Sequence, residues 1–135
     1  MDRISAAIVA KDESANLRQL LPMLRWADEV VVVVDARTQD ATAETARAYG
    51  CRVMVRPFDT YADQRNAALA LAQGDWVFWL DADERPSPGL AEELRQRASG
   101  RRAYGFRTPI RSWIFGRRLR WGGIQDDRPV RVVRR

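Results

Sequence analysis

Residues 74–85 read GDWVFWLDADER, a stretch that combines a buried strand with a cluster of acids. Its five apolar residues, 76–80, run directly into Asp81, Asp83 and Glu84. A run that is apolar on both faces is typical of a parallel strand covered on both sides. Open α/β sheets bind ligands at the carboxyl ends of such strands, where carboxylates suit Mg²⁺ or Mn²⁺. The stretch therefore favours a metal site over a turn cluster neutralised by Arg85.

The composition limits the classes of protein to which the chain can belong. Its 135 residues, 46% of them hydrophobic, suffice for one domain with a core. No apolar run reaches membrane-spanning length, and the first residues lack the apolar region of a secretory signal. Cys51 is the only cysteine and histidine is absent, which excludes an internal disulfide, a histidine-based triad and a typical zinc site. Catalysis would have to rely on carboxylates, arginines and a bound cation.

Charge divides the chain into two parts. Residues 1–100 carry 12 Lys and Arg against 16 Asp and Glu, a net charge of −4. Residues 101–135 carry 11 Arg against two Asp, a net charge of +9. A basic segment of this kind suits nucleic acid, anionic lipid or phosphate-bearing ligands. We expect one compact domain with a β/α region at 1–100 and a basic strand and loop segment at 101–135.

The apolar runs predict alternating strands and helices. Strands are expected at 4–10, 30–34, 51–55 and 76–80, and later at 103–108 and 128–133; helices are expected at 15–26, 61–72 and 88–98, with another ending at 49 and a hairpin or exposed loop at 115–121. Pro22 predicts a kink or an early end of the first helix. Ser14 or Asp12 is expected to cap that helix, and Thr60 the one after 51–55. This order predicts an α/β fold, Rossmann-like, with a mostly parallel sheet flanked by helices.

Polar side chains follow other predicted strands at the same edge of the sheet. Asp35 ends the second strand, and Lys11, Asp12 and Glu13 follow the first. In a nucleotide site, the position of Asp35 suits an acceptor for a base N–H or a ribose hydroxyl. Each residue alone is also compatible with an ordinary turn. Their convergence at one edge favours a ligand site.

Two further features carry alternative interpretations. Arg65, in the first turns of a helix, suits a phosphate or a base carbonyl, or is a solvated surface arginine. Trp113, Phe115 and Trp121 alternate with arginines in the basic segment. This pattern is compatible with a nucleic-acid stacking platform or an interfacial membrane patch, whereas the apolar side of a lid is the simpler interpretation.

Three segments together resemble a known family. They are ISAAIVAKDES at 4–14, WADEVVVVVDARTQDAT at 26–42 and YADQRNAALALAQGDWVFWLDADE at 61–84. Their succession resembles the donor half of an inverting family 2 glycosyltransferase of the GT-A fold, nearest the lipopolysaccharide-core β-glucosyltransferase branch. The basic segment is similar to that branch as well, with its Gly-Gly, an aspartate and a final RVVRR strand.

The resemblance implies a nucleotide-sugar site with assigned roles. Its expected residues are Ala10, Asp12, Glu13, Asp35, Arg65, Asp81 and Asp83. Asp35 would contact the uracil or ribose, and Arg65 the base or diphosphate. Asp81 would contact the ribose or sugar. Asp83, with Asp81 beside it, would bind the Mg²⁺ or Mn²⁺ that bridges the diphosphate.

The resemblance also implies a sugar-transfer reaction and a cellular location. A cation and arginines stabilise the leaving nucleoside diphosphate, and inversion needs a carboxylate base. Asp127 is the expected base and Asp126 the second candidate. The expected donor is a UDP-sugar, and the acceptor a cell-envelope or lipid-linked glycan, as in lipopolysaccharide biosynthesis. We expect a cytoplasmic protein at the inner face of the membrane, with peripheral contact through the basic segment.

The chain departs from the family pattern at several positions. Residues 36–40 read ARTQD where SGSTD is usual, so Arg37 predicts an altered nucleotide edge. Asp12 replaces an asparagine, and Asp126 replaces the proline before Asp127. Similar proteins also continue further and carry a Val-His-Glu type segment. We therefore expect a truncated chain or a minimal member.

Three other functions compete with this interpretation. A nucleotidyltransferase would need a glycine-rich phosphate loop after the first strand, and residues 10–14 contain no glycine. A phosphohydrolase with Asp81 as nucleophile would carry its acidic motif on the first strand. A nucleic-acid-binding module would use the Arg/Trp part of residues 101–135, although nucleic acid is the less expected partner.

Overall fold

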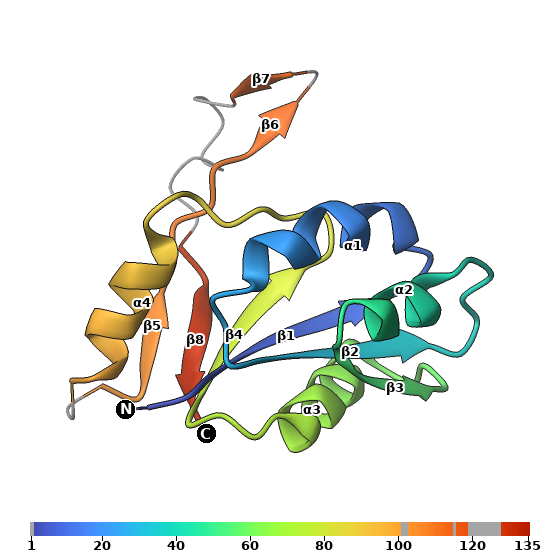
Figure 1. The fold of residues 1–135 in the computed structure, drawn as a ribbon, viewed down its shortest axis with the longest axis horizontal. Coiled ribbons are helices and arrows are strands. Elements are labelled where there is room, and N and C mark those ends of the chain that lie inside the picture. The colour runs from blue at the N-terminus through green and yellow to red at the C-terminus, as the bar shows by residue number, and fades with distance from the viewer. Residues whose placement is uncertain (1, 101–102, 115, 119–127) are drawn as a thin grey trace.

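The computed structural model describes residues 2–100, 103–114, 116–118 and 128–135. It shows an α/β fold on a six-stranded sheet of order β3-β2-β1-β4-β8-β5 (Figure 1). The strands are β1 (Ile4–Ala10), β2 (Glu29–Asp35), β3 (Arg52–Arg56), β4 (Trp76–Asp81), β5 (Gly105–Arg107) and β8 (Val130–Arg134). β1 to β4 are parallel, whereas β8 runs antiparallel to both β4 and β5. The predicted mostly parallel sheet is confirmed.

Helices cover both faces of the sheet. They are α1 (Ser14–Leu20), continued by the 3-10 helix η1 (Leu21–Leu24), α2 (Thr42–Ala48), α3 (Tyr61–Leu71) and α4 (Leu90–Ala98). α1, α2 and α4 pack on one face, through Leu17, Ala46 and Leu94, and α3 packs on the other through Ala68 (Figure 1). None of the helices that the structure describes is long and apolar enough to cross a membrane.

The central position of β1 determines where a ligand can bind. Ile8 lies opposite Val32 of β2 on one side and Leu80 of β4 on the other. The chain therefore passes from β1 outward to β2 and β3, and then returns through α3 to the opposite side of β1. In open α/β sheets, the crevice at such a reversal of strand order is where ligands bind.

Local signals placed the boundaries of some helices correctly. The α-helical part of the first helix ends at Leu20, and Pro22 sits in the first turn of η1, which confirms the predicted early end. The Thr60 hydroxyl accepts a hydrogen bond from the Asp63 N–H at 3.1 Å, which confirms the predicted cap of α3.

The predicted cap of α1 is wrong, because both candidate side chains make hydrogen bonds to residues outside α1. Ser14 is the first helical residue, and its hydroxyl shares a 2.8 Å hydrogen bond with Thr45 Oγ1 of α2. Asp12 Oδ1 accepts from the Gln39 N–H at 2.7 Å, in the loop before α2. Both side chains therefore join α1 to the region of α2 and leave the N-terminal N–H groups of α1 uncapped by either.

The basic segment contributes both to the sheet and to a hairpin. β5 and β8 fall within or near the predicted strands at 103–108 and 128–133. β6 (Trp113–Ile114) and β7 (Arg117–Arg118) form a separate antiparallel pair that stands away from the sheet (Figure 1). The observed hairpin strands begin before the hairpin or exposed loop predicted at 115–121, of which residues 115 and 119–121 lie outside the described part of the chain.

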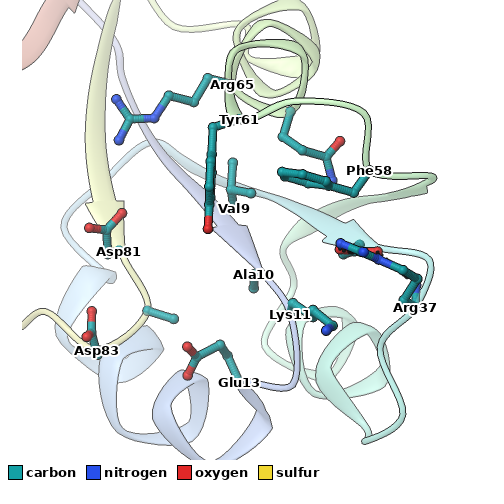
Figure 2. A pocket seen from close by; sticks show the side chains of 13 residues that line it. Val9, Ala10, Lys11, Glu13, Arg37, Phe58, Tyr61, Arg65, Asp81 and Asp83 are labelled. Atoms are coloured by element: carbon teal, nitrogen blue, oxygen red, sulfur yellow. Dashed lines mark hydrogen bonds and ion pairs between the residues drawn. The ribbon is translucent and has the colours of Figure 1, made fainter.

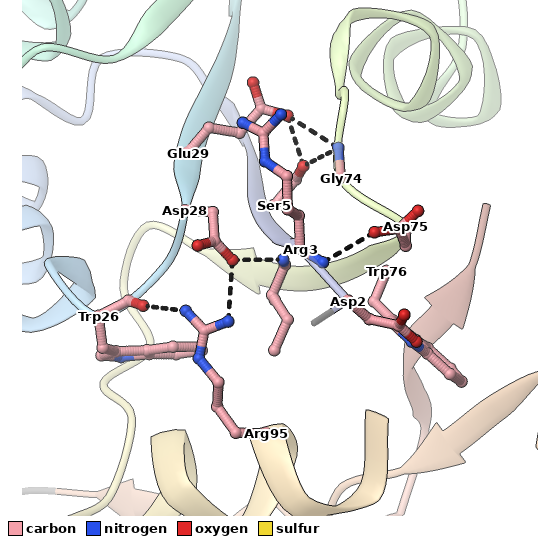
Figure 3. Close-up of polar contacts among 11 residues, drawn as sticks. Asp2, Arg3, Ser5, Trp26, Asp28, Glu29, Gly74, Asp75, Trp76 and Arg95 are labelled. Carbon is pink, nitrogen blue, oxygen red and sulfur yellow. Dashed lines mark hydrogen bonds and ion pairs between the residues drawn. The ribbon is translucent and has the colours of Figure 1, made fainter. Parts of the chain in front are cut away.

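A polar cluster joins the strands at the edge opposite their carboxyl ends (Figure 3). Glu29 Oε1 accepts from the Ser5 hydroxyl and from the Gly74 N–H at 3.2 Å, and the Gly74 N–H also donates to Ser5 Oγ at 2.8 Å. Burial acts to raise the pKa of Glu29, but the hydrogen bonds from Ser5, Gln73 and Gly74 hold it below its ordinary value. The cluster fixes the turn before β4 to β1 and β2.

Candidate functional site

A cleft of about 680 Å³ lies at the carboxyl ends of β1, β2 and β4. The predicted donor-site residues that line it are Ala10, Glu13, Asp35, Arg65, Asp81 and Asp83. Asp12 is not among the lining residues, because its carboxylate turns to Gln39 and its backbone takes a left-handed φ of 52°. Asp126 and Asp127, the predicted base candidates, lie outside the described residues.

The acidic end of the cleft is built on a tight turn after β4. Asp81 ends the strand, and the Glu84 N–H donates to the Asp81 carbonyl oxygen at 3.0 Å, which closes the turn. Ala82 is 3% exposed and anchors the turn, whereas Asp81 and Asp83 are exposed. Figure 2 shows both carboxylates on the same side of the cleft as Glu13.

An arginine from the basic segment pairs with two carboxylates of this turn. Arg131 Nη2, on β8, lies 2.7 Å from Glu84 Oε1 and 3.6 Å from Asp81 Oδ2. Burial and the neighbouring Asp81 raise the pKa of Glu84 to about 7, although Arg131 opposes the shift. Arg85, the counter-ion in the alternative interpretation, instead donates to the carbonyl oxygens of Ala82 and Glu84, each at 2.7 Å.

The acidic end fits a divalent cation that arrives with a diphosphate. Within residues 2–100, 103–114, 116–118 and 128–135, no group of three or more His, Cys, Asp or Glu is placed to hold a metal ion by itself. Asp81 and Asp83 nevertheless present two exposed carboxylates to the cleft. Mg²⁺ is commonly held by one or two carboxylates, with substrate phosphates and water completing its shell.

The other end of the cleft contains an ion pair whose carboxylate is buried and whose guanidinium is exposed. Asp35 ends β2 and is 3% exposed. Arg37 Nη2 donates to Asp35 Oδ2 at 2.6 Å, and the Arg37 N–H donates to Oδ1 at 2.9 Å. These hydrogen bonds lower the pKa of Asp35 to about 2. The Arg37 guanidinium also lies over the Phe58 ring, 5.1 Å from its centroid.

α3 supplies the remaining wall of the cleft. Figure 2 shows Tyr61 between Arg65, on the side of Asp81, and Phe58, on the side of Arg37. Phe58 and Tyr61 meet edge to face with ring centroids 5.1 Å apart. The Arg65 guanidinium lies over the ring of Trp79, 5.6 Å from its centroid. This contact holds the positive charge of Arg65 near the carboxyl end of β4.

Lining side chains that the sequence-based site did not include are those of Phe58, Tyr61 and Gln64. Lys11 was expected at this edge of the sheet and Arg37 was expected to alter its nucleotide end, but neither had been assigned a contact. Phe58 and Tyr61 flank the Thr60 cap. The only sequence signal for their place in the site was this pair of aromatic residues around the start of a helix. Gln64 is fully buried, which its polar side chain did not suggest.

Comparisons with known proteins identify the family of the chain. The family described as "Glycosyl transferase family 2" matches residues 5–129. The lipopolysaccharide core biosynthesis glycosyltransferase LpsC of Rhizobium meliloti is 30% identical over 138 residues, which cover 98% of this chain and 51% of that protein. An uncharacterized glycosyltransferase of Rickettsia felis is 34% identical over 94 residues, which cover 70% of this chain and 33% of that protein. The chain thus spans about a third to a half of these relatives.

The fold also matches solved structures. Glucosyl-3-phosphoglycerate synthase of Mycobacterium tuberculosis, in complex with UDP, gives a TM-score of 0.64 at 22% sequence identity, over 83% of this chain and 46% of that chain. TarS of Staphylococcus aureus gives a TM-score of 0.56 at 26% identity, over 72% of this chain and 31% of that chain. These matches confirm the predicted GT-A fold.

Proposed function

The chain belongs to glycosyl transferase family 2, and from this premise we propose that it forms the donor-binding part of a glycosyltransferase that uses a nucleotide-sugar. The observation that carries the proposal is the cleft, which joins the carboxylates of Asp81 and Asp83 to the guanidinium of Arg65 in one space of about 680 Å³. A nucleoside diphosphate needs groups of both signs: carboxylates that hold a cation against its phosphates, and an arginine that donates directly to phosphate oxygens.

Each part of the cleft then has a task in sugar transfer. Arg65, held against Trp79, donates to the diphosphate. Asp83, with Asp81 beside it, holds a divalent cation, which when bound supplies positive charge to the departing diphosphate. The acceptor hydroxyl forms the new bond to the anomeric carbon opposite the bond that breaks, which inverts the configuration. A carboxylate takes the hydroxyl proton, and Asp127 is the proposed base with Asp126 second.

The proposed donor is a UDP-sugar, and the proposed acceptor is a cell-envelope or lipid-linked glycan. The donor is supported by the synthase of similar fold, which has been solved with UDP and with Mn²⁺ and UDP-glucose. The acceptor is supported by the name of LpsC, which refers to lipopolysaccharide core biosynthesis. The basic segment, 101–135, would face anionic lipid or an acidic glycan at the inner side of the membrane. We propose that the activity lies in the cytoplasm.

Calorimetry with UDP and UDP-glucose, with and without Mn²⁺, tests the proposal. Asp83→Asn removes one negative charge at the acidic end, and we expect the Mn²⁺-dependent affinity to fall about tenfold, which corresponds to about 1.4 kcal/mol. Glu93→Gln is the matched control, because Glu93 lies on α4 and is paired with Arg97. We expect this control to bind like the wild type.

Two results would contradict the proposed function. The first is UDP binding that is equal with and without Mn²⁺ and unchanged by Asp83→Asn. The second is tight, salt-sensitive binding of a single-stranded oligonucleotide by a chain that binds no nucleotide-sugar, which would favour the nucleic-acid-binding module.

A further inference from the structure

The Asp35 carboxylate, at the end of β2, already accepts hydrogen bonds from Arg37. Asp35 Oδ1 accepts from the backbone N–H and from Nε of Arg37, at 2.9 and 3.1 Å, and Oδ2 accepts from Nη2 at 2.6 Å. The Arg37 side chain is 63% exposed, whereas that of Asp35 is 4% exposed. A ligand that enters this end of the cleft therefore meets Arg37 before it meets Asp35.

The ion pair orients Arg37 for a second set of hydrogen bonds. A guanidinium carries five N–H donors in one plane, and Asp35 takes those along the Nε–Nη2 edge. The Nη1–Nη2 edge lies on the other side of the group. The Phe58 ring, whose centroid lies 5.1 Å from Arg37 Cζ, contacts the guanidinium as well. Arg37 thus presents a pair of fixed, permanently charged donors at the cleft.

A second residue points to a ligand that carries acceptors at this end of the cleft. Gln64 lines the cleft and is 0% exposed, and its Oε1 accepts from Arg56 Nη1 at 2.8 Å. Its Nε2 is buried and has no hydrogen-bond partner among the residues that the structure describes. Arg56 lies opposite Asp35 in the sheet register, and Gln64 lines the same cleft as Asp35 and Arg37. Buried amide donors normally have an acceptor.

We propose that Arg37 contacts the nucleobase of the donor, through hydrogen bonds from its Nη1–Nη2 edge to a carbonyl oxygen of the base, and that Asp35 positions Arg37. This inference rests on the proposed function, and it moves the direct contact expected of Asp35 to Arg37. Bases with a ring carbonyl, which are uracil, guanine and cytosine, satisfy these donors. Adenine has no carbonyl oxygen, so adenine nucleotides bind less well.

A direct contact between Asp35 and the base predicts the opposite effect of removing Arg37. If Asp35 accepted the N3–H of uracil directly, the base would have to share with Arg37 a carboxylate that is only 4% exposed. Arg37 would then compete with the ligand, and its removal would strengthen binding. In the proposed arrangement, Arg37 donates to the ligand and its removal weakens binding. The sign of the effect of Arg37→Ala therefore separates the two.

The test is calorimetric titration of the full chain with UDP, 3-methyluridine diphosphate and ADP, in the presence of Mn²⁺. We expect Arg37→Ala to weaken UDP binding at least tenfold, and Arg37→Lys to rescue it only in part, because lysine lacks the planar fork. Asp35→Asn should weaken it too, with little further loss in the double variant. Methylation at N3 should change the affinity less than threefold, and ADP should bind at least tenfold more weakly than UDP.

Arg97→Ala provides the control, since Arg97 is an exposed arginine paired with Glu93 on α4. This control should bind UDP like the wild type. Tighter UDP binding by Arg37→Ala, or failure of the 3-methyl nucleotide to bind, would overturn the inference. Equal binding of UDP by wild type and Arg37→Ala would overturn it as well, while the proposed function stands. If the wild type bound no nucleotide with Mn²⁺, the inference and the proposed function would both be overturned.

Discussion

Replacing Gly74 by alanine tests how the turn before β4 is attached to β1. A Cβ atom at this position would lie 2.5 Å from Ser5 Oγ, 2.8 Å from the Ser5 nitrogen and 2.9 Å from the Arg3 carbonyl oxygen. The serine hydroxyl can rotate away, but the other two atoms belong to the backbone of the central strand and its lead-in. Figure 3 shows this close approach of Gly74 to Ser5. The turn must therefore move if Gly74→Ala is to fold.

The structure allows an estimate of the cost of that movement. The Gly74 N–H donates to Ser5 Oγ at 2.8 Å and to Glu29 at 3.2 Å, and the Trp76 N–H donates to the Arg3 carbonyl at 3.0 Å. Overpacking costs about 1–3 kcal/mol, and a lost hydrogen bond to a charged group about 1.5–3 kcal/mol. We expect Gly74→Ala to lower the free energy of unfolding by about 3–5 kcal/mol and the Tm by roughly 10–15 °C.

Urea denaturation followed by tryptophan fluorescence and circular dichroism measures the effect. Gly89→Ala is the control, because a Cβ atom on Gly89 would meet nothing within 4 Å beyond its chain neighbours. With φ of 84° at this position, alanine there meets only a backbone cost of about 1–2 kcal/mol. Adding Ser5→Ala to Gly74→Ala should not restore stability, because the backbone contacts remain. Full recovery in that double variant, or equal effects of the two glycine variants, would refute the steric explanation.

Two further predictions concern Arg131 and Cys51. Arg131→Met removes the positive charge beside Glu84 and Asp81. We expect the free energy of unfolding, measured by urea denaturation, to fall by about 1.5–3 kcal/mol, and Mn²⁺ to raise the Tm more than in the wild type. Equal rises in Tm would argue against competition between Arg131 and a metal cation. Burial raises the pKa of Cys51 from 9.0 to about 11. At pH 8 its thiol should therefore react with a disulfide reagent roughly 100-fold more slowly in the native chain than in urea, and equal rates would contradict the burial.

Features set by nearby residues in the sequence were predictable. The apolar runs identified β1 to β4, since parallel strands covered on both sides have little polar content. The Thr60 cap and the break at Pro22 depend on a few neighbouring residues, and both were predicted correctly. Ser14 and Asp12 failed as caps, because Thr45 and Gln39 from a distant segment offered competing hydrogen bonds. No local preference contains that information.

The candidate site likewise contains residues that could be predicted from the sequence and residues that could not. Carboxylates at strand ends could be brought together from sequence, because parallel strands end at one edge of the sheet. Arg131 could not be added to them, since its place depends on β8 inserting antiparallel between β4 and β5. Phe58 was missed because its position follows from the path of the loop after β3. The roles predicted for Asp35, Arg65, Asp81 and Asp83 remain predictions.

The two ends of the cleft differ in how firmly an arginine holds their carboxylates. At the end of β2, Arg37 lies 2.6 Å from an Asp35 side chain that is 4% exposed. At the end of β4, Arg131 lies 3.6 Å from an Asp81 side chain that is 55% exposed. A cation can approach Asp81 from solvent and replace the weaker contact, while Arg131 keeps its 2.7 Å pair with Glu84. Asp35 offers no such approach. The cleft therefore combines an acidic end, at which a cation can replace the Arg131 contact with Asp81, with an end at β2 whose Arg37 is already oriented by Asp35.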